Sequence, residues 1–201
     1  MLRTSLIFII TLFAYLLFWP VPIEPVSWDA PKNKGFVGAF EPNNHLSKIE
    51  FIELTDTHGP EGLALLNGEV YAATREGWIL RYNEASGEIT KLVNTKGSPL
   101  GLVFDAENNL LIADAYKGIL SMSPQGELTV ITNSINGLPI EYADDLDVTD
   151  DGKIYFSDAT TKFGAQSNGG TYAASLLDAS EHGSHGRLLV YDPTDQSTKL
   201  V

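Results

Sequence analysis

The sequence predicts an all-β protein made of about three blades of a β-propeller, preceded by an N-terminal transmembrane helix. Two observations predict the blades. A unit of about 40 residues recurs along the chain, and apolar residues alternate with polar ones inside each copy. A third observation predicts the helix, because the chain begins with a long and almost wholly apolar run. A repeated unit cannot bury its apolar faces alone, so the repeat implies stacked or radially arranged sheets.

The three copies of the repeat cover about residues 59–97, 98–137 and 138–201. In the first copy, the alternation predicts strands at residues 62–66, 69–74, 77–82 and 88–93. Asn67-Gly68 separates the first two, and both residue types tolerate the positive φ angles of a tight hairpin. Four short antiparallel strands per copy are typical of a propeller blade. The third copy contains an insertion at residues 164–185, and its middle, Thr171–Ser180, is predicted to form a short helix.

The apolar N-terminal run carries no charge from Thr4 to Ile23, and about 20 apolar residues suffice to span a bilayer. Arg3 favours a cytoplasmic N-terminus, which would place the propeller of a single-pass protein on the extracytoplasmic side, periplasmic or lumenal. A cleaved signal peptide is the alternative, but WPVPIEPVSW offers no small-residue cleavage site. We therefore expect an uncleaved signal anchor at 1–23, a linker at 24–44 and a partial propeller at 45–201.

Composition excludes several classes of function. The formal net charge is −13, which argues against a nucleic-acid partner because such proteins present Lys- and Arg-rich surfaces. The chain has no cysteine, so it has no disulfide, no zinc–thiolate site and no thiol nucleophile. No G-x-S-x-G motif is present either, and this absence gives no support to a serine hydrolase of the α/β type.

Five segments carry a resemblance to a known family: HGPEGLA at 58–64, GSPLGL at 97–102, LLIADAYKGIL at 110–120, ADDLDVTDDGKIYFSDATTKF at 143–163 and GRLLVYDP at 186–193. They resemble the strictosidine synthase-like proteins, which lie within the wider group of propellers that includes gluconolactonases and paraoxonases. The expected anchor ahead of the propeller is similar to that of the adipocyte plasma membrane-associated proteins. The resemblance implies a six-bladed propeller of the calcium-dependent phosphotriesterase-like type.

The resemblance also implies a metal site. Hydrolytic members of the group hold Ca²⁺ or another divalent cation at the end of the central channel, with ligands at the starts of the innermost strands. Glu61 matches the first of these ligands, and Asp144 stands where the family usually has Asn. Carboxylate oxygens are hard ligands of the kind that Ca²⁺ prefers. Without the resemblance, both residues are ordinary polar residues of turns.

His58 lies three residues before Glu61, which makes it a candidate general base or a partner of the metal site. The alternative is a partly exposed loop histidine. Asp114 and Asp158 each follow the second strand of their copies. Because they recur at one position of the repeat, we expect them to accept backbone N–H bonds and fix the turn into the third strand rather than to act in catalysis.

Propellers close with about four to eight blades, so we expect the chain to be the N-terminal part of a longer protein whose further blades are missing here. For that protein the resemblance implies a membrane-anchored, Ca²⁺-dependent hydrolase of small lactone or aryl ester substrates, with the 201-residue chain inactive alone. Two alternatives remain. One is a condensing enzyme of the strictosidine synthase type, which needs no metal. The other is a non-enzymatic, membrane-anchored binding scaffold.

Overall fold

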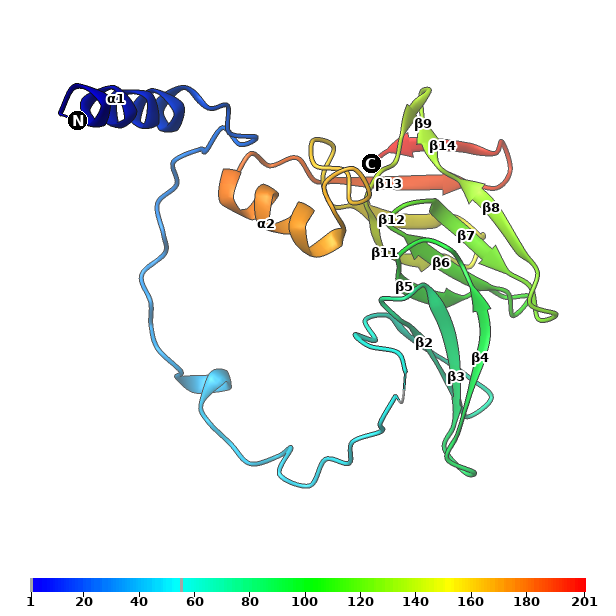
Figure 1. Ribbon diagram of the computed structural model, residues 1–201. Coiled ribbons are helices and arrows are strands. Elements are labelled where there is room, and N and C mark those ends of the chain that lie inside the picture. The colour runs from blue at the N-terminus through cyan, green and yellow to red at the C-terminus, as the bar shows by residue number, and fades with distance from the viewer. Residues whose placement is uncertain (1, 55) are drawn as a thin grey trace.

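The structure, a computed structural model, describes residues 2–54 and 56–201. Three four-stranded antiparallel sheets follow one another along the chain and fan out as part of a ring (Figure 1). The first sheet consists of β1 (Leu63–Leu66), β2 (Glu69–Ala73), β3 (Trp78–Asn83) and β4 (Glu88–Asn94). The second consists of β5 (Pro99–Phe104), β6 (Leu110–Asp114), β7 (Gly118–Met122) and β8 (Leu128–Thr132). The third consists of β11 (Ala143–Val148), β12 (Ile154–Asp158), β13 (Arg187–Asp192) and β14 (Ser197–Leu200).

Each sheet is a meander in which sequential strands pair, so the first strand of each copy of the repeat lies at one edge and the fourth at the other. The strands predicted for the first copy agree with β1 to β4 to within one residue at every end. Asn67 and Gly68 have φ angles of 52° and 80°, as the predicted hairpin requires. A small hairpin of β9 (Ser134–Ile135) and β10 (Leu138–Pro139), which the sequence did not predict, joins the second sheet to the third.

The core lies between the sheets rather than inside any one of them. Neighbouring residues of β6 point to opposite sides: Ile112 packs in the cluster shared with the first sheet, and Leu111 packs in the cluster shared with the third. All five residues of β6 are therefore buried. Burying a large aliphatic side chain stabilises a fold by about 1.5–3 kcal/mol, so these two interfaces hold the three sheets together.

The predicted transmembrane helix is the one part of the expected fold class that is wrong. α1 (Leu2–Phe18) has 17 residues, and a rise of about 1.5 Å per residue makes it about 25 Å long, short of a hydrocarbon core of about 30 Å. Pro20 ends the helix early, because proline disfavours helical backbone at the residue before it. Among residues 2–54 and 56–201, no helix is long and apolar enough to cross a membrane. The extracytoplasmic location expected from Arg3 is not tested by the structure and stays a prediction.

The insertion of the third sheet forms α2 (Thr171–Glu181), which confirms the short helix predicted there. It packs through Ala174 against Leu100, Tyr142 and Phe163, beside the starts of the innermost strands β5 and β11. Between the N-terminal segment and the first sheet, the chain runs as a long exposed connection that contains one short 3₁₀ helix, Gly38–Phe40 (Figure 1). Every residue from 29 to 53 in this connection is exposed.

Candidate functional site: a carboxylate pocket at the innermost strands

Glu61 and Asp144 lie together in the structure. Glu61 precedes β1 by two residues and Asp144 lies near the start of β11, yet both line one pocket of about 330 Å³. Gly62, Leu63, Asp145 and the start of β5 complete its lining. The pocket thus collects residues from the innermost strand of all three sheets, which is the arrangement that the repeat predicts for a site near a propeller axis.

Two glycines allow these strands to approach each other. A Cβ atom added to Gly62 would lie 1.9 Å from the carbonyl oxygen of Leu100. One added to Gly101 would lie 2.5 Å from a carboxylate oxygen of Asp145. Any side chain at either position would force the inner strands apart, and the pocket would lose its shape.

The carboxylates of the pocket repel one another. Asp144 is half-buried, and this burial, together with the charges of Glu61 and Asp145, raises the pKa of Asp144 above its usual value. Burial, followed by the charges of Asp144 and Glu61, likewise raises the pKa of Tyr142. The negative charges of Asp144 and Glu61 therefore also disfavour ionisation of the Tyr142 hydroxyl. A bound cation would relieve this repulsion.

The donor set fits a hard divalent cation in chemistry but is small. Ca²⁺ takes about six to eight oxygen ligands, whereas the pocket offers the carboxylates of Glu61, Asp144 and Asp145. Asp145 already uses one oxygen to accept the N–H of Leu146 at 2.9 Å. Within the part of the chain that the structure describes, no three His, Asp or Glu side chains form a group able to hold a metal ion. The pocket therefore offers two carboxylates, Glu61 and Asp144, and a third, Asp145, one of whose oxygens is already hydrogen-bonded.

The contacts of His58 lead away from this pocket. Its Nδ1 lies 2.9 Å from Oε1 of Glu76, in the turn between β2 and β3, and its backbone N–H donates to the other oxygen of that carboxylate at 3.0 Å. These two contacts hold the pKa of Glu76 at about 2. The side chain of His58 is 78% exposed. This is the exposed loop histidine that the sequence left open as an alternative.

Asp114 and Asp158 accept backbone N–H bonds, as the sequence predicts, but the bonds that they share lie before the first strand of each sheet rather than in the turn into the third strand. Both are buried, and each accepts the backbone N–H of the residue just before the innermost strand of its own sheet. Asp114 accepts from Ser98 at 2.9 Å and also from Tyr116 at 3.0 Å, and Asp158 accepts from Tyr142 at 3.2 Å. The two aspartates therefore fix the entry to β5 and to β11 in the same way.

The remaining oxygens of the two aspartates differ. In the strand register, Asp114 lies opposite Gly118, whereas Asp158 lies opposite Arg187. Nε of Arg187 donates to Oδ2 of Asp158 at 2.8 Å, but Oδ2 of Asp114 is buried and has no hydrogen-bond partner among residues 2–54 and 56–201. Burial raises the pKa of Asp158, and the guanidinium of Arg187 opposes that rise.

Tyr142 is a site residue that the sequence did not reveal. It lies two residues before Asp144, and its hydroxyl donates to the backbone oxygen of Thr171, the first residue of α2, at 3.0 Å. Tyr142 thus joins the strand that carries Asp144 to the helix of the insertion. No spacing or motif marks this residue in the sequence, because the contact joins segments that only the folded insertion brings together.

Comparisons with known proteins agree with this fold. A sequence profile described as "Strictosidine synthase-like, N-terminal" matches residues 38–82. Strictosidine synthase-like protein 6 of Arabidopsis thaliana is 32% identical over 163 residues, covering 78% of this chain and 42% of that protein. The adipocyte plasma membrane-associated protein of Gallus gallus is 29% identical over 202 residues, covering 92% of this chain and 46% of that protein.

Among solved structures, a gluconolactonase from Xanthomonas campestris is similar, with a TM-score of 0.57 and 19% sequence identity. The match covers 70% of this chain and 46% of that one, and at this level of identity it supports the propeller fold alone. The chain spans about half the length of the curated relatives it matches. The family resemblance inferred from the sequence motifs is confirmed.

Proposed function

The chain belongs to the strictosidine synthase-like family, and from this premise we propose that it forms part of a Ca²⁺-dependent hydrolase of small lactones or aryl esters. One observation carries the proposal: Glu61 and Asp144 start from separate innermost strands and share one pocket with a third carboxylate. The proposal also draws on the gluconolactonase whose fold this chain shares, since a lactone is the substrate that its name implies.

In this proposal, Glu61 and Asp144 would hold the cation, and their mutual repulsion favours its binding. The cation would polarise the carbonyl group of an ester or lactone and stabilise the developing oxyanion. Leu100 lines the same pocket and packs against Tyr142, which provides an apolar wall for the substrate. α2 packs against this wall and would shield the pocket from bulk water.

Calcium titration followed by thermal unfolding tests the metal part of the proposal. A ligand at about 100 times its dissociation constant stabilises a protein by about 2.7 kcal/mol, which raises the melting temperature of a chain of this size by roughly 5–10 °C. The Glu61→Gln variant should lose most of this rise. Glu84→Gln, an exposed carboxylate of the β3–β4 turn, is the matched control and should keep it. A melting temperature that does not change with millimolar Ca²⁺ would exclude the metal site.

Hydrolysis of phenyl acetate and of simple lactones tests the reaction class. We expect Glu61→Gln to lose most of any hydrolysis that the unsubstituted protein shows, because the cation would lose a ligand. Equal and measurable rates in the two proteins would refute the role of Glu61. A metal-free condensing enzyme and a non-enzymatic scaffold both predict that Ca²⁺ leaves stability and hydrolysis unchanged.

A further inference from the structure

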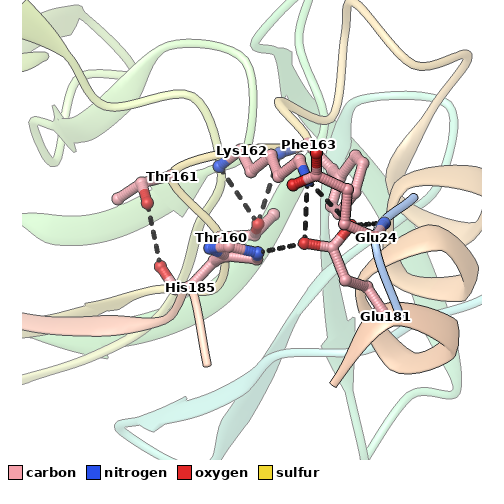
Figure 2. Close-up of polar contacts among 7 residues, drawn as sticks. All are labelled: Glu24, Thr160, Thr161, Lys162, Phe163, Glu181 and His185. Atoms are coloured by element: carbon pink, nitrogen blue, oxygen red, sulfur yellow. Dashed lines mark hydrogen bonds and ion pairs between the residues drawn. The ribbon is translucent and has the colours of Figure 1, made fainter. Parts of the chain in front are cut away.

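Glu181, the last residue of α2, is a buried carboxylate outside the candidate site. It is 2% exposed, and three different groups reach it (Figure 2). Nζ of Lys162 lies 2.8 and 2.9 Å from its two oxygens, Nε2 of His185 lies 2.6 Å from Oε1, and the backbone N–H of Glu24 donates to Oε2 at 2.8 Å. The hydrogen bonds from Lys162 and from the backbone of Glu24 lower the pKa of Glu181 to about 2.

The position of this carboxylate needs an explanation. The C-terminal end of a helix carries partial negative charge, so a glutamate there is disfavoured and a cation is preferred. Burying a carboxylate adds a cost of several kcal/mol unless its oxygens are paired. A residue whose only role was to end the helix would need neither a negative charge nor burial. Glu181 is stable there because Lys162 supplies the opposite charge and a distant part of the chain supplies an N–H donor.

That distant part is the segment 23–28, which we call the N-terminal strap. The N–H of Val26 donates to the backbone oxygen of Glu181 at 2.7 Å, next to the bond from Glu24 to its side chain. Ile23 packs against the cluster that contains Leu100 and Tyr142. Trp28 stacks on His182, with ring centroids 5.3 Å apart and an interplanar angle of 25°. The strap is therefore attached at several points, through Ile23, the backbone of Glu24 and Val26, and the ring of Trp28, although residues 24–28 are exposed.

Residues with positive φ angles flank α2 on both sides. Before it, Gly169 and Gly170 have φ angles of 84° and 113°, and after it His182 and Ser184 have φ angles of 55° and 56°. Such backbone is strained for residues other than glycine, so surrounding contacts must hold it in place. Tyr142 holds the first residue of the helix, while Glu181 and the strap hold the last. These attachments hold the two ends of the helix, while Ala174 packs its middle against the neighbouring apolar cluster.

We infer that the N-terminal strap locks α2 beside the carboxylate pocket and that Glu181 is the latch between them, a positioning residue that acts through the helix. Ile23 of the docked strap packs against the apolar cluster that contains Leu100 and Tyr142. Opening the latch frees the C-terminal end of α2 and widens the way into the pocket. The attachment of the strap to α2 does not depend on the proposed function. The effect on ligand entry rests on the proposed function.

Hydrogen exchange of single backbone amides tests the lock. In Glu181→Gln the carboxylate charge that pairs with Lys162 is lost, and we expect the amide of Val26 and those of the last turn of α2 to exchange on the order of tenfold faster. In Glu24→Pro the strap loses the N–H that donates to Glu181, while Glu181 keeps Lys162 and His185. This second variant should also speed exchange in α2, and it does not depend on the folding of the first.

Two controls separate the latch from a general loss of stability. Glu24→Gln changes a side chain that is 91% exposed and leaves the backbone donor in place, so exchange should stay within about twofold of the unsubstituted protein. Glu84→Gln should behave in the same way. If Glu24→Pro leaves the exchange of α2 unchanged, the strap does not lock the helix and the inference is wrong. Uniform acceleration across all three sheets in both latch variants would equally overturn it.

Terbium(III), a luminescent substitute for Ca²⁺, tests the consequence at the pocket. Its luminescence is sensitised by nearby aromatic rings, and Tyr142 lies two residues before Asp144. We expect terbium to associate several-fold faster with Glu181→Gln than with Glu84→Gln. If terbium does not bind the unsubstituted protein, the proposed metal site is wrong. Hydrogen exchange still tests whether the strap holds α2. If terbium binds all variants at one rate, the latch does not control entry.

Discussion

The ion pair between Asp158 and Arg187 allows the most quantitative prediction. Asp158 lies in the third sheet with its side chain 1% exposed, and the side chain of Arg187 is 18% exposed. The substitution Arg187→Met removes the guanidinium, keeps much of the volume, and leaves a buried carboxylate that keeps the N–H of Tyr142 as a donor. We expect a large loss of stability, because an uncompensated buried charge is far more harmful than a missing contact.

The size of this loss follows from the burial of the pair. Removing one partner of a buried ion pair costs about 3–5 kcal/mol, and the partial exposure of Arg187 places this case near the lower end. For a chain of this size, 1 kcal/mol corresponds to roughly 2–4 °C in melting temperature. Arg187→Met should therefore lower the melting temperature by roughly 6–12 °C.

Thermal unfolding followed by circular dichroism measures this shift, and the chain offers a matched control. Arg81 in the first sheet lies 3.6 Å from Glu69, with side chains that are 39% and 25% exposed. A pair of this kind contributes about 0–1 kcal/mol, so Arg81→Met should shift the melting temperature by less than about 4 °C. The double variant Asp158→Asn with Arg187→Met should recover part of the loss, because no buried charge remains. If Arg187→Met destabilises the protein no more than Arg81→Met, the argument from burial is refuted.

Two further predictions concern the pocket and a turn. Burial and the charges of Glu61 and Asp145 raise the pKa of Asp144 in the folded protein. The folded protein therefore binds a proton more readily than the unfolded chain, and the free energy of unfolding falls as the pH rises from about 3.8 through that raised pKa. Asp144→Asn should remove this fall and raise the melting temperature at neutral pH without divalent metal; an unchanged or lower value would contradict the repulsion. Gly118 and Gly126 have φ angles of 80° and 87°, but a Cβ on Gly118 would lie 2.3 Å from the backbone oxygen of Thr132, whereas one on Gly126 has no atom within 4 Å. Gly118→Ala should therefore cost about 2–4 kcal/mol in chemical denaturation against about 1 kcal/mol for Gly126→Ala, and equal costs would show that the clash is relieved by movement of the backbone.

The blades could be predicted from the sequence because their determinants are local. The alternation of apolar residues and the Asn67-Gly68 turn act over a few residues, so each strand of the first copy is specified within its own hairpin. The N-terminal run shows the limit of such reasoning. An apolar composition up to Ile23 predicted a spanning helix, but Pro20 stops the helix at Phe18 because one backbone restriction outweighs the preference of the whole segment.

The candidate site could be predicted only in part. The family resemblance, not the repeat alone, pointed to Glu61 and Asp144, and the structure places both in one pocket because the repeat brings the starts of the inner strands together. Tyr142 and Glu181 were not found, because their partners come from the insertion and from the segment before the propeller. No periodicity relates these parts of the chain, and their contacts appear only when the three-dimensional arrangement is known.

The bond between Glu24 and Glu181 joins residues that are 157 positions apart. Contacts within the sheets are made between neighbouring strands, so they close short loops, whereas this bond closes one that includes all three sheets. We therefore expect the strap to dock after the third sheet and its insertion have folded, and to detach before them on unfolding. The fluorescence of Trp28, stacked on His182, should report this late step in refolding as a phase slower than sheet formation. Since residues 29–53 are exposed, residues 2–28 would be the least stable cooperative unit among the described parts of the molecule.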